Sequence, residues 1–249
     1  VMYGFLRSPR WIAGLIVVAT VAAVFLALGN WQLTRHREVR LDNEVFSTRL
    51  EAEPIDLATM LASAGPSIDS LEYRRAITTG TFEPAGEVLV RNQVDNGTAG
   101  FHVVTPFRFG GGTILVNRGW VPLELDTPPI AAAPPPSGRV EVDLLVRTSQ
   151  PIPRFGRVEP EGELEVVNRI DLERLDSQFA DLAPAWGQLI LLGEEARLPV
   201  TLDVPTFDDD GPHLAYAAQW FLFATIAVVG SGFLIRSTAK KAVRRRNQT

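Results

Sequence analysis

The residues best suited to chemistry in this sequence are three histidines, His36, His102 and His213. No pair of them has metal-ligand spacing, so a zinc site built by the protein alone is not expected. The sequence has no cysteine, which excludes disulfides, thiolate metal sites, iron–sulfur clusters and cysteine nucleophiles. It also has no Gly-x-Ser-x-Gly elbow and no phosphate-binding glycine loop before a helix. We therefore expect a protein that is not an enzyme, and an enzyme with an undetected external site is the less favoured alternative.

His213 is the most informative of the three because of its neighbours. Pro212 suits the first position of a helix, so His213 is expected to begin one. Tyr216 and Trp220 follow three and seven residues later and share its helical face. An aromatic belt at a membrane interface is the alternative interpretation. His, Tyr and Trp together with Gln219 exceed what anchoring needs, and a neutral imidazole can ligate iron. Together these residues favour a functional site around His213 over interfacial anchoring alone.

Two other stretches add candidate residues. The stretch 29–35 contains Trp31 and Arg35, and for Trp31 alone interfacial anchoring is the simpler interpretation. The stretch 117–122 lies at the end of a strand-like run, where a turn is the simpler interpretation. Arg118 could instead present its planar guanidinium to a carboxylate.

Two uncharged runs must position the residues around His213. They cover residues 11–34 and 213–235, and each helix would be about 35 Å long, enough for a hydrocarbon core of about 30 Å. We predict a transmembrane helix in each run. A cleaved signal peptide is the alternative for the first run, because Ala27-Leu28-Gly29 resembles a small-x-small cleavage site. The first run is longer than the apolar core of a usual signal peptide.

Small residues in the two runs suggest how the helices pair. Such residues let helices approach closely. Ordinary alanine content is the alternative explanation. The expected stripes are Ala19, Ala23 and Ala27 on the first helix and Ala217, Ala224 and Ala227 on the second.

The charges are segregated along the chain. Residues 1–10 and 236–249 hold eight basic residues and no acidic one, whereas the middle holds 16 basic residues against 29 acidic ones. Basic ends favour the cytoplasm, so we predict cytoplasmic segments at 1–10 and 236–249 and an extracytoplasmic domain at 35–212. Arg35, Arg37 and Arg40 oppose this rule locally. The acidic middle argues against nucleic-acid binding.

The middle of the chain predicts a β-rich domain with short helices. A helix is expected over 41–51, and Asp56 and Asp171 can cap helices at 57–64 and 172–179. Gly110-Gly111-Gly112 indicates a hairpin loop, and the proline-rich segment 122–138 an extended surface excursion. Short runs rich in Val, Ile and Phe predict strands at 73–81, 88–92, 101–109, 113–120, 140–148, 164–170 and 188–192. The predicted fold is an α+β membrane protein in which two terminal helices bracket a small barrel or sandwich.

At these residues the sequence resembles the surfeit-locus-one family of cytochrome c oxidase assembly proteins. Three stretches carry the resemblance, in order and beside the two terminal runs: Leu28-Gly29-Asn30-Trp31-Gln32-Leu33-x-Arg35, Val116-Asn117-Arg118-Gly119-Trp120-Val121-Pro122 and His213-Leu214-x-Tyr216-Ala217-x-Gln219-Trp220-Phe221.

The resemblance implies a membrane factor that aids the assembly of haem–copper oxidase and holds or delivers haem a to its catalytic subunit. It implies His213 as the iron ligand with Tyr216 beside it. Arg35 or Arg118 would pair with the propionates, and Trp31 or Trp220 would stack on the macrocycle. Composition and the proline-rich insert suggest an actinobacterial-type member in a bacterial plasma membrane. The alternative function is a permanent accessory subunit that binds no haem, within a bc–oxidase supercomplex.

Overall fold

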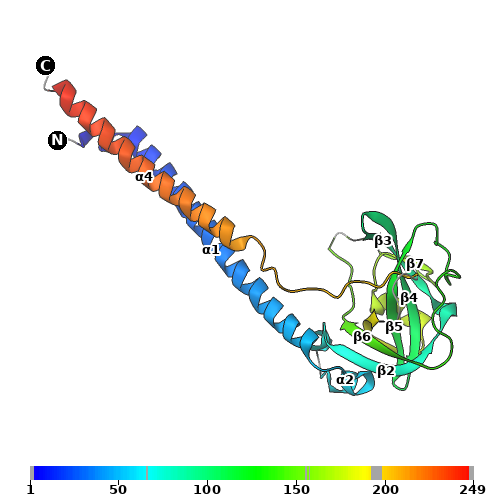
Figure 1. Ribbon diagram of the computed structural model, residues 1–249. Helices are drawn as coiled ribbons and strands as arrows, with labels where there is room; N and C mark the ends of the chain where they lie inside the picture. The colour runs from blue at the N-terminus through cyan, green and yellow to red at the C-terminus, as the bar shows by residue number, and fades with distance from the viewer. Residues whose placement is uncertain (1–2, 66, 155, 157, 192–197, 247–249) are drawn as a thin grey trace. The chain divides into compact units, whose positions relative to one another are not determined.

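The computed structural model describes residues 3–65, 67–154, 156, 158–191 and 198–246 (Figure 1). The chain forms two compact units. The first combines Val1–Glu44 with Phe207–Thr249 and consists mainly of two long helices. The second, Val45–Thr206, is a β-barrel with short helices.

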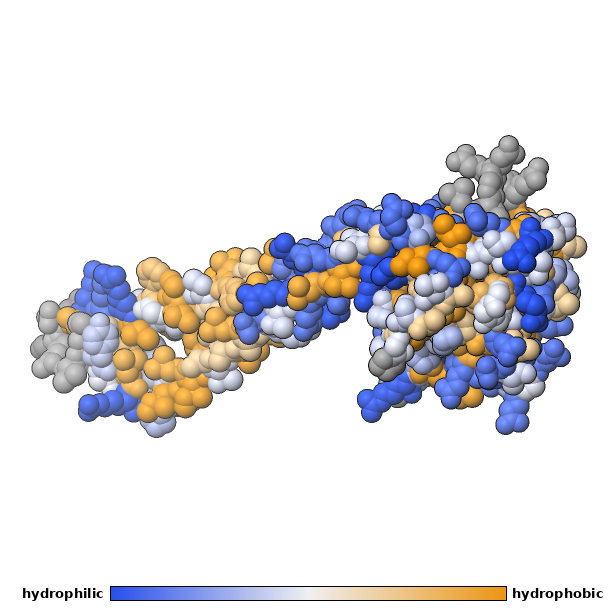
Figure 2. All heavy atoms as spheres, turned by 90° about the horizontal axis from the view of Figure 1, so that it is seen from below, coloured by the Kyte–Doolittle hydropathy of each residue, from blue (hydrophilic) through white to orange (hydrophobic). Residues whose placement is uncertain are grey.

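Helices α1 (Pro9–Glu51) and α4 (His213–Arg246) have 43 and 34 residues. Both are long and apolar enough to cross a membrane. Figure 2 shows hydrophobic side chains gathered along this pair. At 1.5 Å per residue, α1 is about 65 Å long. The helix expected at 41–51 is therefore the continuation of the first apolar helix, with no break between them.

The two helices lie side by side and antiparallel (Figure 1). A series of α1 residues that are at least partly buried recurs at spacings of three and four, as in a coiled-coil seam. They include Trp11, Leu15, Val18, Ala22, Phe25, Gly29, Gln32 and His36.

Gly29 sets the closest approach in this seam. A Cβ at Gly29 would lie 2.7 Å from the ring of Phe221, so only glycine admits that ring. Ala217 and Ala224 are buried on α4, as predicted. The stripe of Ala19, Ala23 and Ala27 was wrong, because all three are exposed and α1 buries Ala22 and Gly29 instead.

The barrel unit contains two short α-helices, α2 (Leu57–Ser63) and α3 (Leu172–Leu175). Asp56 caps α2 as predicted, accepting a hydrogen bond from the backbone of Thr59. Asp171 caps α3 as predicted, but the α-helix ends at Leu175 instead of reaching residue 179. A single 3-10 turn follows it. The 3-10 turns of the chain are η1 (Gly4–Arg7), η2 (Ile68–Leu71), η3 (Pro84–Gly86) and η4 (Asp176–Gln178).

Eight strands form one sheet in the order β1-β2-β6-β8-β5-β4-β3-β7, and pairing of β2 with β4 closes five of them into a barrel. Of the two predicted alternatives, a small barrel or a sandwich, the domain is therefore the small barrel. The strands are β1 (Ile55–Asp56), β2 (Arg75–Phe82), β3 (Val88–Asp95), β4 (Thr98–Phe109), β5 (Gly112–Pro122), β6 (Val140–Arg147), β7 (Val166–Val167) and β8 (Leu182–Leu191).

Alternate residues of the barrel strands point inward and form the main core. Phe107, Ile114 and Leu144 are fully buried there, and Leu57 and Met60 of α2 pack against them. In a barrel this small, side chains fill the interior. The described side chains therefore pack the barrel interior as a core.

Two strand predictions needed correction. The strand expected over 164–170 is only the two-residue β7. The strand expected at 188–192 begins earlier, at Leu182, and residue 192 lies outside the described residues. The start of β8 was missed because of Pro184, since proline has no backbone N–H to donate to a neighbouring strand and therefore argues against a strand. The register with β5 shifts at this point, which accommodates it.

Candidate functional site

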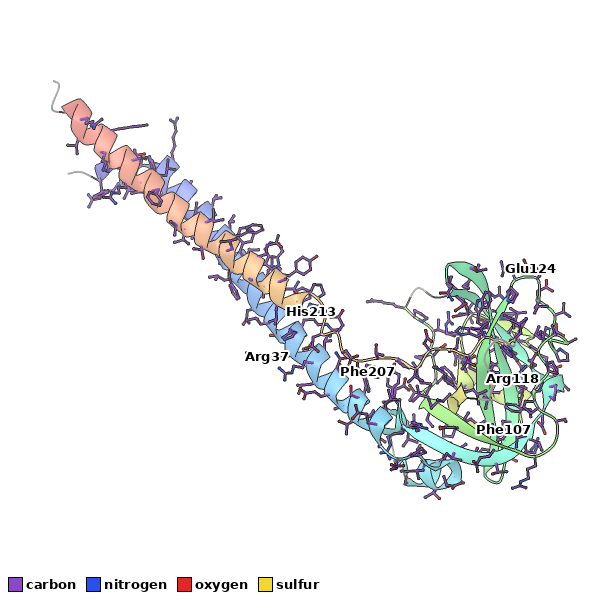
Figure 3. The ribbon with its side chains drawn as sticks, in the orientation of Figure 1. Arg37, Phe107, Arg118, Glu124, Phe207 and His213 are labelled. Carbon is purple, nitrogen blue, oxygen red and sulfur yellow. The ribbon has the colours of Figure 1, made fainter. Side chains whose placement is uncertain are left out.

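His213 is the first residue of α4, as predicted, and its ring is half-buried in the seam with α1. The helix begins directly after Pro212, and the carbonyl of Pro212 accepts a hydrogen bond from the backbone N–H of Tyr216 at 3.1 Å. Nδ1 of His213 lies 2.8 Å from Oε1 of Gln32 on α1. Figure 3 labels His213 at the start of α4. This contact brings together two of the three stretches that carry the family resemblance.

The other ring nitrogen of His213, Nε2, faces a glycine. Gly211 has a φ of +73°, and a Cβ there would lie 3.4 Å from Nε2. A positive φ favours glycine, and the absence of a side chain at Gly211 also keeps a Cβ out of contact with this edge of the ring. The arrangement suits an imidazole that is held on one nitrogen and open on the other.

The aromatic candidates differ in their surroundings. Trp31 and Tyr216 are exposed, at 58% and 48%. Trp220 instead packs in the helix pair, where its ring stacks on Phe25 with centroids 5.6 Å apart and meets Phe223 edge-on at 5.9 Å. Trp31 and Tyr216 thus have free faces, whereas part of the Trp220 surface is already covered.

Arg35 lies one turn after Trp31 on α1 and is exposed. Its Nη1 is 3.2 Å from a carboxylate oxygen of Glu38, and both side chains are more than half exposed. A surface pair of this kind contributes little, so the guanidinium can exchange this partner for another anion.

The segment before α4 is also held by α1. Nδ2 of Asn43 donates to the carbonyl of Asp209 at 3.3 Å and to Oδ1 of Asp210 at 3.1 Å. Gln32 and Asn43 of α1 thus form hydrogen bonds with His213 and with the segment that precedes it, respectively.

Figure 3 labels Arg118 in the barrel. Its side chain takes part in a buried polar cluster. Its guanidinium meets a carboxylate, as one sequence interpretation suggested, and that carboxylate is Glu87 of the same chain, at 2.6 Å. Nε of Arg118 donates to Thr105 at 2.7 Å. Glu87 also accepts from the hydroxyl of Thr105 and the backbone of Ile130. The side chains of Arg118 and Glu87 are only 2% and 0% exposed.

A β-bulge lies at Arg118. Val103 pairs with Gly119 and Val104 with Asn117, so Arg118 is the extra residue in β5. Ile114 and Val116, at the alternate positions before it, belong to the main core, so Arg118 lies on the same face of β5, and the bulge changes the alternation only after it. Burial lowers the pKa of the Arg118 guanidinium and the Glu87 carboxylate opposes that shift.

His102 faces the same motif from β4. Asn117 accepts from the backbone of Gly119 through Oδ1, so its Nδ2 is the group that faces Nδ1 of His102 at 3.2 Å. Burial lowers the pKa of His102 to about 4. His102 is therefore a neutral structural histidine in the folded barrel at neutral pH.

This burial predicts an acid-sensitive barrel. The unfolded chain protonates His102 below about pH 6.5, while the folded barrel resists protonation until about pH 4. Stability from this residue is complete above pH 6.5 and falls as pH drops towards 4, by about 2–3 kcal/mol. We expect His102→Gln to lose less stability between pH 7 and 4.5 than the wild type in urea titrations followed by tryptophan fluorescence. Equal losses in both proteins would contradict this.

A cavity of about 760 Å³ lies beside the barrel, lined by parts of β3, β4 and the segments around Glu163 and Phe179. None of the sequence-predicted site residues lines it. Within the described ranges, no cluster of three or more His, Asp or Glu residues could hold a metal ion.

The structure therefore groups the predicted residues in two places. His213, Tyr216, Trp220, Trp31 and Arg35 lie in the helical unit and Arg118 in the barrel. Sequence reasoning missed the partners: Gln32 for His213, and Glu87 and Thr105 for Arg118. Gln32 lies in the first of the three stretches that carry the resemblance. Glu87 directly precedes the apolar strand residues Val88-Leu89-Val90. Both positions could therefore have been noticed in the sequence.

The sequence model of the SURF1 family matches residues 19–225, which include both Gln32 and His213. The chain belongs to the SURF1 family. This confirms the resemblance drawn from the three stretches.

Several SURF1 relatives match over long stretches. An uncharacterized SURF1-like protein of Mycobacterium bovis is 30% identical over 233 residues, covering 92% of this chain and 84% of the relative. A SURF1-like protein of Monosiga brevicollis is 28% identical over 247 residues, covering 90% and 88%. Surfeit locus protein 1 of Xenopus tropicalis is 33% identical over 159 residues, covering 57% and 48%.

Proposed function

We propose that this SURF1-family chain assists assembly or stabilisation of haem–copper cytochrome c oxidase in a bacterial plasma membrane and holds haem a for its catalytic subunit. The observation that carries the proposal is the contact between Gln32 and His213. It joins the first and last stretches of the resemblance at one ring nitrogen. Family membership supports the assembly role, and the histidine supports the cofactor.

The residues present fit a haem. Nδ1 of His213 is engaged and Nε2 faces a glycine, so Nε2 is the atom that would hold the haem iron. When bound, haem a would bring an iron that accepts an imidazole nitrogen, together with two propionates and a long apolar tail. The exposed faces of Trp31 and Tyr216 can cover the macrocycle. Arg35 can pair with a propionate, whereas Arg118 is already buried against Glu87 and is left out of the proposed site.

The proposed membrane arrangement follows from the two helices and their charges. Both α1 and α4 cross the bilayer, the basic ends at 1–10 and 236–249 face the cytoplasm, and the barrel lies outside. His213 then sits near the outer boundary, where apolar tail and polar propionates find suitable surroundings.

Purification in mild detergent tests the proposal. We expect oxidase subunits to co-purify with the full chain, and extracted haem a to fall at least tenfold in His213→Ala. His36→Ala is the matched control, because His36 is also a half-buried imidazole of the helix pair. An unchanged haem a spectrum and affinity in His213→Ala would remove His213 as the ligand. Stoichiometric co-purification without any haem signal would favour the accessory-subunit function.

A further inference from the structure

Gln32 is the residue that holds the ring of His213. Within the described chain it is the side chain that shares a hydrogen bond with this imidazole, across the seam between α1 and α4. Gln32 is itself partly buried at a seam position. Its reach to His213 is thus fixed by helix packing, whereas the exposed Gln219 of α4 has no such constraint.

The contact also determines where the imidazole carries its proton. The group facing Nδ1 is Oε1 of Gln32, at 2.8 Å. A carbonyl oxygen can only accept, so Nδ1 must carry the hydrogen. A neutral imidazole protonated on Nδ1 has its lone pair on Nε2. Nε2 is the nitrogen that faces Gly211, so the open edge of the ring is also the edge able to donate electrons.

We infer that Gln32 is a positioning residue that fixes the tautomer and orientation of His213 and makes Nε2 its ligand atom. The inference deepens the proposed function and rests on it for the identity of the ligand, haem a. Histidines that bind metals generally donate their second N–H to such an acceptor, which orients the ring and raises its basicity. A glutamine from the first helix would supply that acceptor to a histidine on the second.

The tautomer is measured first, without haem. Full-length protein in mild detergent is labelled with 15N-histidine, and the His213 signals are identified by their loss in His213→Ala. We expect wild-type His213 to be protonated on Nδ1 and unprotonated on Nε2. In Gln32→Leu this preference is lost, while the matched Gln219→Leu retains it. A wild-type ring protonated on Nε2, or the same tautomer in Gln32→Leu, would overturn the inference.

Titration with haem a provides the second measurement. Gln32→Leu should weaken binding about 10- to 100-fold, the usual effect of removing such a partner. Gln32→Glu keeps an acceptor, so it should restore the affinity and lower the reduction potential of the bound haem, because a carboxylate makes the imidazole a stronger donor. Gln219→Leu should change neither value.

The two proposals fail in different ways. If His213→Ala abolishes binding and Gln32→Leu does not weaken it, haem binding stands and the role of Gln32 is refuted. If the wild type binds no haem a, the cofactor proposal is refuted, and the 15N spectra still decide whether Gln32 fixes the tautomer of His213.

Discussion

Glu87→Gln is expected to lower the free energy of unfolding of the barrel by about 3–5 kcal/mol, because it leaves the Arg118 guanidinium buried without its counter-charge. Arg118 and Glu87 are 2% and 0% exposed and 2.6 Å apart. The same carboxylate accepts from Thr105 and Ile130, so the substitution also weakens those bonds. Urea denaturation followed by the fluorescence of the barrel tryptophans measures the change.

The barrel contains its own control for this prediction. Glu83 and Arg108 form a second Glu–Arg pair, 2.7 Å apart, with side chains 41% and 48% exposed. Glu83→Gln makes the same chemical change in solvent and should cost less than about 1 kcal/mol. Similar losses in Glu83→Gln and Glu87→Gln would show that burial is not what makes the Arg118 pair matter.

Gly119→Ala is the second substitution with a large expected effect. Gly119 has a φ of +137°, and a Cβ there would lie 2.2 Å from the carbonyl oxygen of Val200. Val200 pairs with Trp120 by two backbone hydrogen bonds of 2.8 Å, so its carbonyl cannot simply move away. Backbone strain of about 1–3 kcal/mol adds to a clash of about 1–3 kcal/mol.

Two other glycines separate these contributions in thermal or urea unfolding. Gly97 has a φ of +80° and nothing within 4 Å of a Cβ, so Gly97→Ala should show strain alone. Gly110 has neither constraint, and Gly110→Ala should be neutral or stabilise by about 0.4–1 kcal/mol. If Gly119→Ala costs no more than Gly97→Ala, the close approach of Val200 does not constrain this position.

Local signals in the sequence were sufficient for much of the fold. Strands β3 to β6 followed from short apolar runs, and the cap at Asp56 from its side-chain chemistry. The parallel pairing of β5 with β8 could not be predicted, because it joins distant segments and β8 contains Pro184. The buried pair of Arg118 with Glu87 depends on the same kind of long-range contact, because the two residues are 31 positions apart in the sequence.

For the helical site, the sequence predicted where the second helix begins but not which residue of α1 contacts its first histidine. The start of α4 at His213 followed from Pro212 and the apolar run after it. The partner Gln32 depends on which face of α1 meets α4. The outward-facing and seam positions of this helix are both apolar, so composition does not fix that face. Ala19 and Ala23 looked as suitable as Ala22, and the ring of Phe221 against Gly29 decided between them.

The two contacts that α1 makes with the chain entering α4 have a geometric consequence. Gln32 and Asn43 are 11 residues apart, which is about three helical turns, so both point the same way from α1. Inserting one alanine between them would rotate one contact by about 100° relative to the other. The chain entering α4 could then keep its hydrogen bond with Asn43 or the one between His213 and Gln32, but not both. The position along α1 at which the second helix begins is therefore fixed by the helical repeat of α1 between Gln32 and Asn43.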